Sequence, residues 1–220
     1  MNTDQPLKLF PLNKVLFPGM PLYLNIFEER YKQMINECIE TDAPFGVILI
    51  KNGTEAGGPL AQTFETGCAA KIAFFEYQDD GRIRLIAFGT EKFTVTQFSQ
   101  KKDYLTAHVH FEMPIQSEYK TIEKYDHKLR DLLKKYMTLL ADLQKIEFFP
   151  IDFPEDPVQM TYFIANILSV PLTTKQNLLN LTKFEQLIAK VTDLFDDECR
   201  ILKMKFDSIN NANMGPFFLN

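Results

Sequence analysis

The sequence contains few cysteines and no long apolar run, and both absences limit what the chain can be. Its three cysteines, Cys38, Cys68 and Cys199, are far apart and form no Cys-x-x-Cys pair. The sequence therefore predicts neither a disulfide framework nor a thiolate zinc site. No apolar stretch is long enough to span a bilayer, and the N-terminus lacks the cationic and apolar regions of a signal peptide. We expect a cytoplasmic protein with reduced thiols and no membrane contact.

The motifs of common catalytic sites are also missing. None of the serines lies in a G-x-S-x-G or S-x-x-K motif, and the Gly-rich loop at residues 52–59 lacks the lysine of a Walker motif. His108 and His110 share a strand face, but Glu112 lies about 13 Å from His108 along an extended strand, so the three cannot close on one ion. The sequence predicts no catalytic residue, no metal site and no cofactor, and therefore a protein that is not an enzyme.

Tryptophan is absent and positive charge is in deficit, whereas phenylalanine is abundant. Of the 220 residues, 45% are hydrophobic and 24% are charged, as in ordinary soluble globular proteins. The 20 phenylalanines are expected to lie mostly in the core. The net charge of −5 argues against a nucleic-acid partner, since phosphate binding draws on concentrated Lys and Arg. The length allows one large domain or two small ones.

The first half of the chain reads as short strands. From Leu7 to about Met113, short apolar segments alternate with turn residues, and Asp80-Gly81 between two such segments predicts a hairpin. Further breaks between strands are expected at Gly67 and at Gly89-Thr90. Repeated short strands with one inserted helix predict a small barrel or pseudo-barrel rather than a parallel sheet.

The inserted helix is predicted from apolar residues at helical spacing. Asn25 and Glu28 provide a plausible capping start for it. The residues of its apolar face are Tyr31, Met34, Ile35, Cys38 and Ile39. The face requires a sheet to cover it.

The second half of the chain is helical, because the apolar period changes from two to about 3.6 at Ser117. One long helix follows, and three more helices are predicted from Ser/Thr/Asp capping signals. The three signals are Asp156 with Gln159, Thr173 with Gln176, and Thr182 with Glu185. We expect an α+β protein with a β-rich subdomain at residues 1–116, a bundle of about four helices at residues 117–206 and a tail at residues 207–220.

Five segments in this order resemble the N-terminal substrate-binding domain of the Lon proteases over essentially Leu7 to Phe206. They are Leu9 to Leu12 with Leu16 to Leu22; Ile26 to Tyr31; Gly67 to Ile72; Asp80 to Arg82 with Gly89 to Phe93; and Asp156 to Leu168 with Pro171-Leu172 and Lys175 to Leu179. The resemblance implies a β-rich, PUA-like (pseudouridine-synthase-associated-like) barrel followed by a helical bundle. Lon proteases add an ATPase and a serine-lysine peptidase, whose motifs this sequence lacks, so the chain is similar to stand-alone bacterial LON-domain proteins.

The resemblance also implies a function, namely non-catalytic binding of unfolded or damaged polypeptide, as an adaptor or holdase. A protease or a chaperone would be a further partner. Polypeptide binding requires accessible apolar side chains. The candidates are Phe17, Met20, Phe64, Phe75 and Phe88, although core packing is the favoured explanation for each of them taken singly. The tail residues Phe217, Phe218 and Leu219 are candidates for docking into an apolar groove.

A second function stays open at this point. Related barrels contact RNA, so the PUA-like barrel is also a candidate nucleic-acid-binding module. Basic side chains would then have to converge on one surface. The residues concerned are Arg82, Arg84, Lys92, Lys101 and Lys102.

Overall fold

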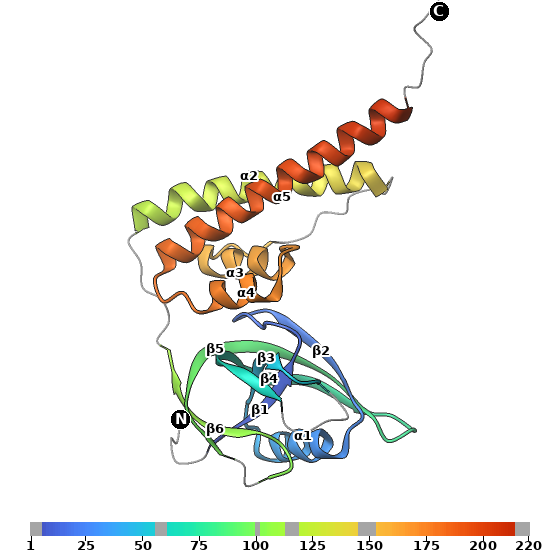
Figure 1. The fold of residues 1–220 in the computed structure, drawn as a ribbon, viewed down its shortest axis with the longest axis vertical. Coiled ribbons are helices and arrows are strands. Elements are labelled where there is room, and N and C mark those ends of the chain that lie inside the picture. The colour runs from blue at the N-terminus through green and yellow to red at the C-terminus, as the bar shows by residue number, and fades with distance from the viewer. Residues whose placement is uncertain (1–5, 56–60, 100–101, 113–118, 145–152, 214–220) are drawn as a thin grey trace, which may run out of the picture. The chain divides into compact units, whose positions relative to one another are not determined.

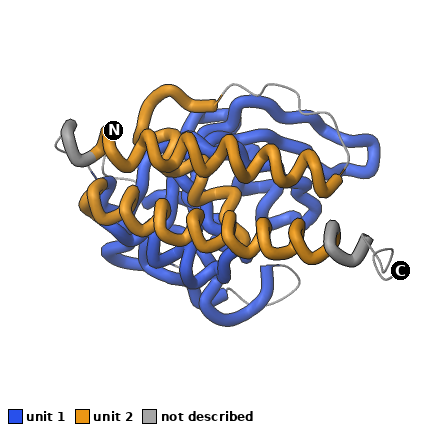
Figure 2. The backbone as a smooth tube through the Cα atoms, turned by 90° about the horizontal axis from the view of Figure 1, so that it is seen from above, with its two compact units in different colours: residues 1–115, 170–181 blue, residues 116–169, 182–220 orange. Residues whose placement is uncertain are grey.

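The computed structural model describes residues 6–55, 61–99, 102–112, 119–144 and 153–213. The chain forms two compact units, which Figure 2 shows in different colours. Unit 1 contains residues 1–115 and 170–181, and unit 2 contains residues 116–169 and 182–220. The predicted docking segment Phe217, Phe218 and Leu219 lies outside the described residues.

Unit 1 is built on six strands (Figure 1). Their order is β2-β5-β4-β3-β1-β6, and a further pairing between β5 and β6 closes a ring. Only β1 and β3 are parallel among the pairs described. This arrangement confirms the predicted pseudo-barrel. The elements of unit 1 are β1 (Leu7–Leu12), β2 (Pro21–Ile26), α1 (Glu29–Thr41), β3 (Phe45–Asn52), β4 (Gln62–Tyr77), β5 (Ile83–Ser99), β6 (Thr106–Phe111) and α4 (Leu172–Leu179).

The strands β4 and β5 are longer than the sequence predicts, because neither Gly67 nor Gly89 ends a strand. Both glycines are buried within their strands. A Cβ atom would clash with the carbonyl oxygen of Val47 at Gly67 and with that of Phe17 at Gly89. The prediction of breaks here was wrong because these glycines allow close approach of a neighbouring backbone, the second common role of glycine in a strand.

The interior of the ring is apolar. Phe93 is fully buried and its ring meets Phe111 edge-on, with 6.4 Å between centroids. The side chains of this cluster come from five of the six strands and from the loop before β6. They are Leu9, Ile48, Ala69, Phe93, Val95, Leu105 and Ala107. The barrel is therefore a packed core rather than a channel.

Helix α1 covers one side of unit 1 with the predicted apolar face, of which Tyr31, Met34, Ile35 and Cys38 are buried. The predicted capping start at Asn25 is wrong. The helix begins at Glu29, its N-cap is Glu28, and no side chain caps it. Asn25 is instead the fifth residue of β2, where it pairs with Arg84 of β5.

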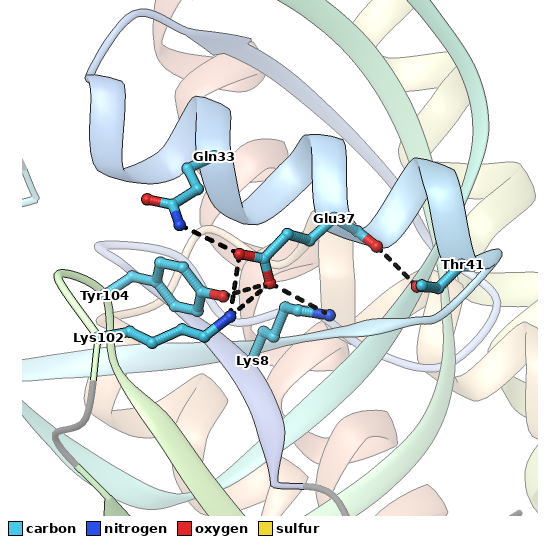
Figure 3. A network of polar contacts seen from close by, with 6 residues as sticks. All are labelled: Lys8, Gln33, Glu37, Thr41, Lys102 and Tyr104. Carbon is cyan, nitrogen blue, oxygen red and sulfur yellow. Dashed lines mark hydrogen bonds and ion pairs between the residues drawn. The ribbon is translucent and has the colours of Figure 1, made fainter.

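The polar side of α1 is fixed to the barrel through Glu37 (Figure 3). Its carboxylate accepts hydrogen bonds from the Lys102 ammonium (2.7 Å) and from the hydroxyl of the fully buried Tyr104 (2.7 Å). Lys8 of β1 lies 3.9 Å from the same carboxylate, and Gln33 donates to it from the preceding turn of the helix in Figure 3. Two segments distant in sequence, β1 and the loop before β6, are thus tied to α1 through one carboxylate.

This network predicts a loss of stability in acid. Burial raises the pKa of Glu37, but hydrogen bonds from Lys102, Tyr104 and Gln33 lower it by more than burial raises it. The folded-state pKa therefore lies below its ordinary value of 4.5. A lowered carboxyl pKa stabilises the fold above the ordinary value, and that contribution is lost as the pH falls through the folded-state pKa. We expect wild type to exceed Glu37→Gln in unfolding free energy by up to about 1 kcal/mol at pH 7. Urea denaturation over a pH series should show the difference shrinking below pH 4.5, and a constant difference would contradict this origin.

Unit 2 is helical and contains α2 (Tyr119–Gln144), α3 (Pro157–Ile167) and α5 (Phe184–Asn213). The rings of Tyr136 on α2 and Phe195 on α5 lie 5.2 Å apart, and the Tyr136 hydroxyl donates to Glu198. Figure 1 shows α2 and α5 running side by side over most of their length. The helices after residue 117 confirm the predicted helical second half.

The predicted helix starts have different outcomes. Asp156 caps α3 as expected, since its carboxylate accepts a hydrogen bond of 2.8 Å from the backbone N–H of Gln159. The start predicted at Thr173 is wrong, because α4 begins at Leu172 with Pro171 at the N-cap. Helix α4 belongs to unit 1. There the buried Gln176 donates to the carbonyl oxygen of Thr66 on β4.

Candidate functional site

Aromatic side chains gather on the outer face of β2, β5 and β4. In one row across these strands, Tyr23 pairs with Ile86, and Ile86 pairs with Phe74. Directly paired residues point to the same side of a sheet, and residues two apart on one strand do so as well. Phe88 therefore shares the side of Ile86. We call Tyr23, Phe74, Ile86 and Phe88 the outer aromatic face.

This face is exposed although its residues are apolar. Tyr23 is 68% exposed, Phe74 53% and Phe88 44%, whereas the alternate residues of β5, Leu85 and Ala87, are fully buried on the other side. Exposed apolar residues that are scattered singly need no explanation, but contiguous ones mark interaction sites. Flat aromatic rings bury a large apolar area at a low cost in side-chain entropy, which suits them to binding polypeptide.

The structure separates the five residues that the sequence offered as candidates. Phe17 and Met20 are buried, at 0% and 5% exposure, and so contribute to the core in this structure. Phe64 is half-buried, near the opposite end of β4 from Phe74. Phe75 is paired with the buried Leu85 and so points to the other side of the sheet. Phe88 alone of the five belongs to the outer aromatic face.

Sequence reasoning missed Tyr23, Phe74 and Ile86. A usable signal exists for Ile86, because Arg84 must point to solvent and the alternation of a strand places Ile86 and Phe88 on the same side. For Phe74 there is no such signal. The register shift between Ile72 and Phe74 in the pairing with β5 interrupts the alternation of β4.

A cleft of about 260 Å³ lies beside the outer aromatic face, between β2 and β1. Leu24, Ile26 and Phe27 line it from the side of β2, and Phe10 and Leu12 line it from β1. The carboxylate of Glu55 is at its edge and accepts a hydrogen bond from the backbone N–H of Asn13. Among the described residues, Glu55 forms no ion pair with Lys or Arg. The cleft is thus lined by apolar side chains together with Asn25 and the acidic residues Glu28 and Glu55.

Four of the five basic residues that would have to converge on nucleic acid have an acidic side chain nearby. Arg82 pairs with Asp80 at 3.1 Å, and Arg84 lies 3.8 Å from Glu76. Lys102 binds Glu37. Lys92 is buried against Glu112 at 2.7 Å, and Lys101 lies outside the described residues. These residues give a nucleic-acid interface no support.

The three cysteines are buried, and burial raises the pKa of each thiol, to about 12 for Cys68 and about 11 for Cys38 and Cys199. Such thiols are poor nucleophiles at neutral pH. His108 and His110 are exposed on β6. Within the described part of the chain, no group of three His, Cys, Asp or Glu side chains is placed to hold a metal ion. The same residues include no helix both long and apolar enough to cross a membrane.

Comparison with known proteins agrees with the geometry. Residues 6–197 match the model of the ATP-dependent protease La (LON) substrate-binding domain. Lon protease 2 of Myxococcus xanthus is 25% identical over 96% of this chain, and Lon protease 2 of Syntrophobacter fumaroxidans is 25% identical over 86% of it. The chain spans about a quarter of the length of these relatives, 26% and 24% respectively.

Two solved structures share the fold. The Lon N-terminal domain protein from Xanthomonas campestris superposes with a TM-score of 0.61 at 23% identity, over 84% of this chain and 98% of that one. The N-terminal domain of the Mycobacterium avium complex Lon protease gives 0.62 at 12% identity, over 88% and 99%. The likeness in fold is therefore retained where little sequence identity remains.

Proposed function

Because the chain belongs to the family of LON substrate-binding domains, we propose that it binds unfolded or damaged polypeptide without catalysing a reaction on it. The observation that carries the proposal is the outer aromatic face. A folded partner is not required, because exposed rings in a row bind apolar side chains of any extended or collapsed chain. By keeping such chains apart, the protein acts as a holdase, or as an adaptor where a protease or chaperone takes over the client.

The outer aromatic face has the composition expected of such a site. Its rings are held on three paired strands, so they stay exposed without collapsing on one another. Aromatic residues carry a large share of the binding energy in protein interfaces. The acidic net charge of −5 adds repulsion between copies of the protein, which keeps an exposed apolar surface soluble.

We expect Phe88→Ser to weaken binding of a reduced, carboxymethylated and therefore unfolded client protein about tenfold. A truncated central aromatic of an interface costs about 1 to 2 kcal/mol, which corresponds to that factor. Fluorescence anisotropy of the labelled client measures the affinity. The triple variant with Tyr23→Ser and Phe74→Ser added is expected to abolish binding, and with it the suppression of client aggregation seen by light scattering.

Phe98→Ser is the matched control. Phe98 lies on the same strand, β5, and is 43% exposed, almost as much as Phe88 at 44%. It is not part of the outer aromatic face. Both substitutions are expected to change the unfolding free energy by less than about 0.5 kcal/mol. If Phe98→Ser weakens client binding as much as Phe88→Ser, or if the triple variant binds normally, the proposed surface is wrong.

A further inference from the structure

The strand β2 has one edge that is not paired with any described strand. It is the first strand in the sheet order and its pairing is with β5. Near its start, the N–H of Gly89 donates to the carbonyl oxygen of Met20 at 2.9 Å. Antiparallel pairs alternate between residues that exchange hydrogen bonds and residues whose groups point away. Since Met20 bonds to β5, Leu22 and Leu24 also face β5, and the residues between them face outward.

The outward groups are therefore the N–H and C=O of Tyr23 and of Asn25. No described residue forms a hydrogen bond with these backbone groups. Pro21 has the same orientation and has no N–H, as expected for a position outside the ladder. Tyr23 and Asn25 are about 6.8 Å apart along the strand, the spacing at which a further strand forms its hydrogen bonds.

The space beside this edge is open and shaped for a side chain. The cleft of about 260 Å³ is lined by Tyr23 to Ile26 and also by Phe10 and Leu12. A strand added to β2 would direct alternate side chains into this cleft and toward the rings of the outer aromatic face. The negative Glu55 at the rim of the cleft favours a Lys or Arg next to the apolar residues.

We infer that clients bind as an added strand on the free edge of β2, with backbone hydrogen bonds to Tyr23 and Asn25. This inference rests on the proposed function and specifies the class of client segment. The segment is extended, apolar on both faces and flanked by a basic residue. Segments that form core strands in a folded protein have this apolar pattern, and unfolding exposes them. Amphipathic helices do not meet this requirement, because their backbone groups are already paired.

The test uses a fluorescein-labelled peptide, Ser-Lys-Val-Phe-Ile-Val-Thr-Lys, and two isomers with the same number of N-methyl groups. One isomer is methylated at the first Val, at Ile and at Thr, which are the first, third and fifth residues after the first Lys. The other is methylated at the first Lys, at Phe and at the second Val. In an added strand, one set of N–H groups faces β2 and the other faces solvent. We expect the affinities of the two isomers for the wild-type protein to differ at least tenfold, the better isomer binding like the unmodified peptide.

A substitution in β2 provides a second measurement. Asn25→Pro removes the outward N–H and spares the hydrogen bonds between β2 and β5, whereas Asn25→Ala removes the side chain and retains the N–H. We expect the proline variant to bind the unmodified peptide about tenfold more weakly than wild type, and the alanine variant to bind within about twofold of wild type. Circular dichroism and thermal melting report whether each variant is folded, and the methylated isomers decide the question on wild type if Asn25→Pro unfolds.

The outcomes are distinguishable. If both isomers bind like the unmodified peptide, strand addition is wrong while polypeptide binding stands. If neither the peptide nor the carboxymethylated client binds wild type, the proposed function fails and this inference fails with it. If the isomers differ tenfold and Asn25→Pro weakens binding while Asn25→Ala does not, the edge of β2 is the site.

Discussion

Gly89→Ala is expected to lower the free energy of unfolding by about 3 kcal/mol, although the change adds a single methyl group. A Cβ atom at this position would clash with the carbonyl oxygen of Phe17. That oxygen belongs to backbone, in the turn where the N–H of Met20 donates to it, so a side-chain rotation cannot relieve the clash. Overpacking of this kind costs about 1 to 3 kcal/mol when the neighbour must move. Urea denaturation followed by circular dichroism measures the loss.

Gly46→Ala is the comparison that isolates the cause. Gly46 is also a buried strand glycine, but a Cβ atom there would meet the ends of side chains, of Leu9 at 2.6 Å and of Leu7 and Phe93 at 2.8 Å. Side-chain ends can shift, so we expect a smaller cost of about 1 kcal/mol. Equal costs for the two substitutions would show that contact with the Phe17 backbone is not what constrains Gly89.

Lys92→Met is expected to destabilise unit 1 by about 2 to 4 kcal/mol, since it removes one partner of a buried ion pair. The side chain of Lys92 is 5% exposed, and its ammonium lies 2.7 Å from the Glu112 carboxylate. The same ammonium donates a hydrogen bond of 2.7 Å to the carbonyl oxygen of Leu181. Methionine fills the same volume but leaves the Glu112 carboxylate, which is 21% exposed, without its cation. The midpoint of urea denaturation measures the loss.

Two further variants test this explanation. Lys71→Met breaks the ion pair with Asp42, in which the side chains are 55% and 81% exposed, and is expected to cost less than about 0.5 kcal/mol. Adding Glu112→Gln to Lys92→Met removes the stranded charge and is expected to recover about 1 kcal/mol or more. A double variant as unstable as the sum of its two single variants would mean that the two charges do not interact.

A helix cap set by residues close in sequence was predicted correctly, whereas features set by residues distant in sequence were not. Asp156 caps α3 as predicted because its hydrogen bond reaches only to Gln159, three residues away. A strand break is predicted at Gly89 because glycine is a common turn residue, whereas here its role is set by the backbone of Phe17 on a distant segment. Lys92 is one of the basic residues that the sequence offers for binding nucleic acid. Its burial could not be predicted because its partners, Glu112 and Leu181, lie 20 and 89 residues further along the chain.

By itself the sequence determined which segments are extended and which are helical, and hence the α+β fold, because apolar periods of two and 3.6 depend on near neighbours only. Only the tertiary structure decided which apolar side chains remain in contact with water. Phe17 precedes a proline and Phe88 precedes a glycine, yet one is fully buried and the other is 44% exposed. Burial depends on which strand pairs alongside and in which register, and a shift of one residue reverses the two faces of a strand.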